Sequence, residues 1–129
     1  MIYLDSAAVA KLVRTEPSTE ALVGWLNVRT DVPLVSSVLV EVEVPRALRR
    51  SDPTALPAVP ATLARITRLE VDATVRAVAA SFLDPRLRGL DAIHLATALQ
   101  VAGQLQAFVT YDERLLASAQ IAGLPVASP

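Results

Sequence analysis

Short apolar segments alternate along this chain with longer segments in which apolar residues recur every three to four positions. The short segments predict strands and the longer ones predict helices. Predicted strands cover residues 2–4, 31–37, 69–71, 106–110 and 125–127. Predicted helices cover residues 6–13, 16–28, 37–50, 61–69 (in part a loop), 72–83, 90–102 and 112–122. This alternation indicates one α/β domain over residues 1–129, with a mostly parallel central sheet covered by helices on both faces.

Residue types near the segment ends predict how several helices begin and end. Ser6 is placed to cap the helix 6–13, and Gly123 is placed to end the helix 112–122. Pro45 lies inside the helix 37–50, where its missing amide hydrogen predicts a kink. The proline-rich segment 51–60 predicts a turn region between helices that is too short to separate two domains.

Composition excludes several classes of protein. Hydrophobic residues make up 53% of the chain, so we expect near-continuous apolar strands and some apolar surface covered by a partner. The net charge of −1 gives no overall basic footprint for nucleic acid. The absence of cysteine excludes disulfides, a thiol nucleophile and cysteine-based metal sites, and it fits a cytoplasmic protein.

Neither the N-terminal run nor the longest uncharged segment predicts a membrane protein. The N-terminal run lacks a basic leader and contains Asp5, so we do not expect a signal peptide. Residues 92–111 carry no formal charge, but they include His94, three glutamines and Gly103. We therefore expect a helix, a turn and a strand in this segment instead of a membrane span.

Acidic residues from distant parts of the chain are predicted to meet at one edge of the sheet. Asp5 ends the first strand, Asp112 follows the strand 106–110, and Asp91 opens the helix before that strand. Because the helix runs antiparallel to the strand, its start lies at the carboxyl edge, where parallel sheets bind ligands. Glu41 and Glu43 begin another helix at this edge, about 200° apart around its axis, so only one can face the site.

Carboxylates gathered in this way need a compensating positive charge. A pair ~4 Å apart repels by about 4 kcal/mol at an effective dielectric near ~20, and a helix N-terminus offsets only ~0.3–1 kcal/mol. Mg²⁺ or Mn²⁺ prefers oxygen ligands and can activate water for phosphodiester hydrolysis. Each acid also has a local alternative: Asp5 and Asp112 could cap helices, and Asp91 could be an ordinary first-turn acid.

His94 is the only histidine, and we expect it to be packed and hydrogen-bonded. A single histidine without cysteine does not make a typical zinc site. No nucleophile-elbow motif accompanies His94, so a serine–histidine–aspartate triad is not indicated.

Four phrases carry a resemblance to a known family. They are "MIYLDSAAVAKLV" at the start, "VSSVLVEVEVPRALRR" in the first third, "RGLDAIHLATAL" later and "FVTYDERLLASAQIAGLPVASP" at the end. In this order and spacing, the chain resembles the PIN-domain ribonucleases, in particular the VapC toxins of bacterial VapBC toxin–antitoxin pairs. The resemblance runs nearly from end to end and implies a PIN-like domain with metal-dependent endoribonuclease activity on structured RNA.

The resemblance also implies which residues form the site. Its acidic pocket would comprise Asp5, Glu43, Asp91 and Asp112, which would hold Mg²⁺ or Mn²⁺. Glu43 is preferred to Glu41 because "EVPRA" matches the spacing of the family motif to Arg46. Ser6 and Thr110 match small hydroxyl residues that orient a ligand or water beside the acids.

Contacts to RNA phosphates would come from arginines near this edge. We favour Arg46, Arg86 and Arg88, and less strongly Arg49, Arg50 and Arg114. The expected partners are the RNA substrate, a small cognate antitoxin and a second copy of the chain in a homodimer. The helix face with Leu22, Trp25 and Leu26 would form either part of the antitoxin groove or ordinary core.

Three other functions are compatible with an acidic α/β site in general. A signalling receiver domain needs a lysine near the last strands, whereas the only lysine here is Lys11 in the first helix. A haloacid-dehalogenase-type phosphatase usually has a second aspartate two residues after the first, where this chain has Ala7. A non-catalytic interaction module of the same fold stays open, although all four acids are present.

Overall fold

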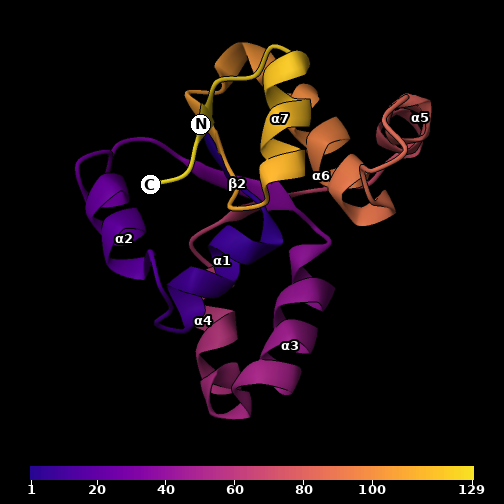
Figure 1. The fold of residues 1–129 in the computed structure, drawn as a ribbon. Helices are drawn as coiled ribbons and strands as arrows, with labels where there is room; N and C mark the ends of the chain where they lie inside the picture. Colours follow the sequence, from indigo (N-terminus) through magenta and orange to yellow (C-terminus); the bar gives the residue numbers. More distant parts are fainter.

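A sheet of five parallel strands forms the centre of the molecule (Figure 1). The computed structural model describes residues 1–129. The strands are β1 (Ile2–Leu4), β2 (Leu34–Ser37), β3 (Thr67–Leu69), β4 (Ala107–Val109) and β5 (Val126–Ala127). Their spatial order is β3-β2-β1-β4-β5, and every neighbouring pair is parallel. The predicted α/β class is confirmed, and the sheet is entirely parallel.

Helices cover both faces of this sheet. They are α1 (Ser6–Val13), α2 (Thr19–Asn27), α3 (Val40–Ser51), α4 (Val59–Leu63), α5 (Ala73–Ser81), α6 (Gly89–Leu99) and α7 (Glu113–Ile121). Helices α1 to α4 pack on one face, whereas α6 and α7 pack on the other, with α5 against α6. In Figure 1, α3 and α4 extend below α1, and α5 lies beyond α6.

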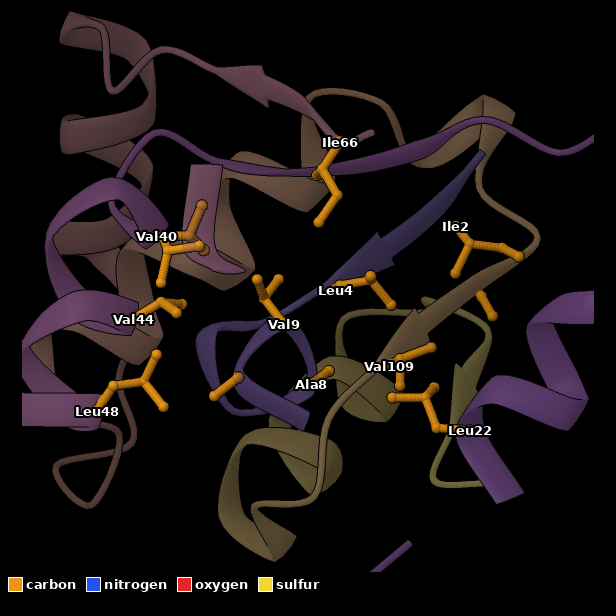
Figure 2. Close-up of a cluster of buried hydrophobic side chains, with 13 residues drawn as sticks. Ile2, Leu4, Ala8, Val9, Leu22, Val40, Val44, Leu48, Ile66 and Val109 are labelled. Atoms are coloured by element: carbon orange, nitrogen blue, oxygen red, sulfur yellow. The ribbon is translucent and has the colours of Figure 1, made fainter. Parts of the chain in front are cut away.

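Successive side chains of β1 point to opposite faces of the sheet, and each face carries its own hydrophobic cluster. Ile2 and Leu4 point into the cluster shared with α1 to α4 (Figure 2), while Tyr3 points into the cluster shared with α6 and α7. On α3, Val44 and Leu48 are fully buried one helical turn apart. Burying a leucine of this kind stabilises the fold by about 1.5–3 kcal/mol. The buried stripe of α3 fixes its rotation, which in turn decides where Glu43 points.

Several predicted boundaries were wrong by a few residues. The third strand begins at Thr67 and ends at Leu69, because its register is set by pairing with β2, whereas the apolar pattern suggested 69–71. Within the proline-rich segment, Pro53–Ala58 form a 3-10 helix and α4 begins at Val59. Helix α3 continues through Pro45 without a break.

The uncharged segment 92–111 contains no membrane-spanning element. Helix α6 ends at Leu99, a 3-10 turn covers Ala102–Gln104, and β4 follows. No helix anywhere in the chain combines the length and apolar character needed to cross a bilayer.

The strand order creates an opening at the carboxyl edge of the sheet. From β1 the chain proceeds to β2 and β3 on one side, and then returns to place β4 and β5 on the other side. The loops that follow β1 and β4 therefore leave in opposite directions. Ligand sites of open parallel sheets form at such a switch in strand order.

Candidate active site

An open pocket of about 590 Å³ lies beyond the carboxyl ends of β1 and β4. All four predicted acids, Asp5, Glu43, Asp91 and Asp112, line this pocket. The remaining lining residues are Ser6, Ala7, Arg88, Gly89, Leu90 and Ile93. Segments separated by more than a hundred positions in sequence therefore place carboxylates around one hollow.

Asp5 directly follows β1 and is the N-cap of α1. Its Oδ1 accepts a hydrogen bond from the Ala8 amide at 2.8 Å, and its side chain is almost completely buried. The prediction that Ser6 caps this helix was wrong, because the extended backbone conformation suited to a cap occurs at Asp5. Ser6 is the first helical residue, and its hydroxyl donates to Glu43 Oε2 at 3.3 Å.

Burial raises the pKa of Asp5, and the nearby Asp91 carboxylate adds to this effect. The Thr110 hydroxyl, the Ala8 amide and the His94 ring all oppose the increase in this pKa. The ionised form of Asp5 is therefore disfavoured in the folded protein unless another positive charge enters the pocket.

Asp112 combines a capping role with a place in the pocket. It is the N-cap of α7, and its Oδ1 accepts hydrogen bonds from the amides of Arg114 and Leu115, both at 2.9 Å. Thr110, which is fully buried, holds the backbone here because its Oγ1 accepts from the Asp112 amide at 3.1 Å. Oδ2 of Asp112 has no hydrogen-bond partner in the protein, so it remains available to a ligand.

Asp91 is the third residue of α6 and is half-buried. Its carboxylate has no hydrogen bond or ion pair. Burial raises its pKa, and so do the charges of Asp112 and Glu43, while His94 and Arg88 act in the opposite direction. A carboxylate with acidic neighbours and no bound partner is suited to receive a cation.

The two glutamates of α3 point in different directions, as the helical spacing predicts. Glu43 lines the pocket, where its Oε1 lies 2.7 Å from His94 Nε2. Glu41 is directed to the neighbouring strand β3, where its Oε1 accepts from Arg68 Nε at 2.6 Å. The structure therefore brings Glu43 to the other acids and leaves Glu41 outside.

His94 and Tyr3 are part of the site in a way that the sequence did not indicate. His94 is buried and hydrogen-bonded, as expected, but one of its partners is Glu43. The other is the Tyr3 hydroxyl, which lies 2.9 Å from Nδ1. Tyr3 is the middle residue of β1, two positions before Asp5, and this spacing was the one available signal.

The donor set of the pocket fits a hard divalent cation. All four candidate ligands supply carboxylate oxygens, and none of the three aspartates is in an ion pair with a protein cation. No three acidic or histidine side chains converge as a ready-made ligand cage. This arrangement suits Mg²⁺, which keeps several waters and is usually held by one or two carboxylates together with substrate phosphates.

The predicted RNA-binding arginines differ in their positions. Arg88 precedes α6 and lines the pocket. Arg86 makes a two-fold hydrogen bond with Asp84, with both distances 3.1 Å, and lies outside the pocket. Arg46 is exposed on α3 one turn beyond Glu43 and does not line the pocket. The weaker candidates, Arg49, Arg50 and Arg114, are also exposed and outside it.

Comparison with known proteins identifies the family of the chain. Residues 2–121 match the PIN domain family. The chain is 50% identical to Ribonuclease VapC35 of Mycobacterium tuberculosis, covering 100% of this chain and 97% of that protein. It is 43% identical to Ribonuclease VapC46 of the same organism, over 99% of this chain and 97% of the relative. The chain therefore belongs to the PIN-domain family, among the VapC ribonucleases.

Proposed function

We propose that this chain is a metal-dependent endoribonuclease that hydrolyses phosphodiester bonds of structured RNA, as the toxin of a toxin–antitoxin pair. The observation that carries the proposal is the gathering of Asp5, Glu43, Asp91 and Asp112 around one pocket at the switch in strand order. No lysine or arginine of the chain forms an ion pair with these acids, so their mutual repulsion is not relieved in this way. The site of action would be the cytoplasm, where the RNA is found.

The four acids and the two neighbouring hydroxyl residues each have a part in this proposal. The four acids would hold Mg²⁺ or Mn²⁺, which supplies a Lewis acid that lowers the pKa of water and stabilises negative charge on a phosphate. The helix caps made by Asp5 and Asp112 fix two of these carboxylates in position. Ser6 and Thr110 orient their acidic neighbours through their hydroxyl groups.

The proposal is tested with the purified chain and whole-cell RNA. We expect defined new RNA ends in the presence of Mn²⁺ or Mg²⁺ and intact RNA after the metal is removed with a chelator. Sequencing of the RNA ends identifies the cleavage site. A chain that bound an antitoxin but left all RNA intact with either metal would instead be a non-catalytic interaction module.

Replacing Arg88 with glutamine should weaken RNA binding. Arg88 is the arginine that lines the pocket, where it can contact a phosphate. We expect the RNA concentration at half-maximal cleavage to rise by roughly 10-fold, in line with about 1.4 kcal/mol for one charged contact. Arg65→Gln is the matched control, because Arg65 is exposed and lines a different hollow near the start of β2. Equal effects of the two substitutions would contradict a phosphate contact by Arg88.

Replacing Glu43 with glutamine should lower the rate of RNA cleavage by roughly 10-fold, which corresponds to about 1.4 kcal/mol of transition-state stabilisation. Glutamine keeps the size of the side chain but removes a negative charge from the pocket. Glu41→Gln should leave cleavage unchanged, because Glu41 is paired with Arg68 away from the pocket. Measured cleavage rates of the two folded variants decide which glutamate belongs to the site.

The proposed protein partners are a small antitoxin and a second copy of the chain. Leu22 is completely buried, so it belongs to the core and not to a groove. Leu26 lines a separate hollow of about 480 Å³ near the start of β2, and the half-buried Trp25 is covered by the Arg29 guanidinium at 3.9 Å. Exposed apolar side chains such as Leu83 and Ile121 are available for association.

A further inference from the structure

A chain of hydrogen bonds runs from the core of the protein to the pocket. The Tyr3 hydroxyl lies 2.9 Å from His94 Nδ1, and His94 Nε2 lies 2.7 Å from Glu43 Oε1. We propose that His94, supported by Tyr3, is a positioning residue that holds the Glu43 carboxylate in its place among the other acids. This inference rests on the proposed function, because it explains how Glu43, one of the proposed metal ligands, is held in place.

The donors and acceptors fit only one arrangement when His94 is neutral. An ionised carboxylate can only accept, so Nε2 must carry the ring proton and donate to Glu43. Nδ1 then has a lone pair and needs a donor, which the phenolic hydroxyl of Tyr3 supplies. Tyr3 thereby selects the ring tautomer that can bind Glu43.

Packing holds the His94 ring rigidly. Tyr3 stacks on Phe108 with ring centroids 5.2 Å apart and an interplanar angle of 11°. His94 meets the Tyr3 ring edge-on at 6.0 Å and 82°, and both residues are fully buried. The three rings come from β1, β4 and α6, so the Nε2 atom is fixed by three elements of the fold.

The bond to Glu43 crosses between the two sides of the molecule. Glu43 belongs to α3, whose buried face packs in the cluster with α1, whereas α6 packs in the opposite cluster. The only other hydrogen bond to the Glu43 carboxylate is the longer one from Ser6 at 3.3 Å. His94 is therefore the main restraint that keeps this carboxylate near Asp91, whose charge repels it.

The ring tautomer can be measured directly because His94 is the only histidine. We expect nuclear magnetic resonance of ¹⁵N-histidine-labelled, metal-free protein at neutral pH to show a protonated Nε2 and an unprotonated Nδ1. Tyr3→Phe should shift the Nδ1 signal, because it loses its donor, while the stacked ring is retained. A proton on Nδ1 with none on Nε2 would overturn the inference.

Metal binding separates positioning from simple packing. We expect His94→Leu to raise the dissociation constant for Mn²⁺, measured by calorimetry, by roughly 10-fold, as for other residues that support metal ligands. His94→Gln, whose amide can still donate to Glu43, should recover part of the loss. Tyr3→Phe should weaken binding by a smaller factor, whereas Tyr111→Phe should not, because its hydroxyl bonds to the Pro129 carbonyl.

These measurements are independent of RNA cleavage. If the wild-type chain showed the expected tautomer and the graded losses of Mn²⁺ affinity but cleaved no RNA, the positioning role would stand and the proposed activity would fail. If the folded variants Tyr3→Phe, His94→Gln and His94→Leu all bound Mn²⁺ as tightly as the wild-type chain, the inference would be overturned. The proposed ribonuclease activity would still stand.

Discussion

Replacement of Asp91 by asparagine is expected to lower the rate of RNA cleavage by about 100- to 1,000-fold. The carboxylate accepts no hydrogen bond within the protein, so asparagine can occupy its place without disturbing α6. What is lost is a negatively charged oxygen among those that line the acidic pocket. A metal ion contributes several kcal/mol to phosphodiester hydrolysis, and each 1.36 kcal/mol corresponds to about ten-fold in rate. Single-turnover cleavage at a fixed Mn²⁺ concentration measures the effect.

Asp31→Asn is the matched control for this substitution. Asp31 is exposed, lies in the loop before β2, and has no side-chain hydrogen bond or ion pair. We expect it to leave the cleavage rate unchanged. Wild-type cleavage by a folded Asp91→Asn protein would remove Asp91 from the proposed site.

The fold was predictable because two simple periodicities carry most of the information. Buried strands such as β1 and β4 are short and entirely apolar, whereas α3 repeats its apolar residues about every four positions. The place of the acids was predictable for a related reason. The carboxyl ends of parallel strands lie at one edge, so Asp5 and Asp112 had to be neighbours once β1 and β4 were paired.

Other features depend on tertiary contacts that no local pattern records. The register of β3 follows from its pairing with β2. Whether Asp5 or Ser6 caps α1 depends on where the backbone leaves the strand, and both residue types are good caps. The contact between Tyr3 and His94 joins positions 91 apart in the sequence, and it exists only because α6 packs against β1 and β4.

Asp5→Asn is expected to stabilise the metal-free protein but to lose most of the stabilisation that Mn²⁺ gives the wild-type protein. Burial raises the pKa of Asp5, so its negative charge opposes folding when no cation is present. Asparagine caps a helix as well as aspartate does, so we expect the free energy of unfolding of the metal-free variant to rise. Wild-type protein should gain about 2.7 kcal/mol at a Mn²⁺ concentration 100 times its dissociation constant, and the variant should gain much less.

Urea unfolding with and without Mn²⁺ measures both effects. Asp72→Asn is the control, because Asp72 caps α5 through the Val75 amide at 2.8 Å and lies outside the pocket. This control should respond to Mn²⁺ as the wild-type protein does. A metal-free Asp5→Asn protein less stable than the wild type would show that the ionised carboxylate supports the fold.

The stability gained from Asp5→Asn should itself depend on pH. Because the folded-state pKa of Asp5 lies above its unfolded value, the protonated carboxyl favours the folded state. The stability that the Asp5 carboxyl contributes to the wild-type protein is therefore fully present below its pKa in the unfolded chain, at pH ~4. This contribution is lost as the pH rises through the pKa in the folded protein. The variant lacks this titration, so its advantage in metal-free urea unfolding should be smallest near pH ~4 and grow to a plateau at higher pH. An advantage that shrank as the pH rose would mean that the folded protein lowers the pKa of Asp5, as expected of a carboxylate already paired with a cation.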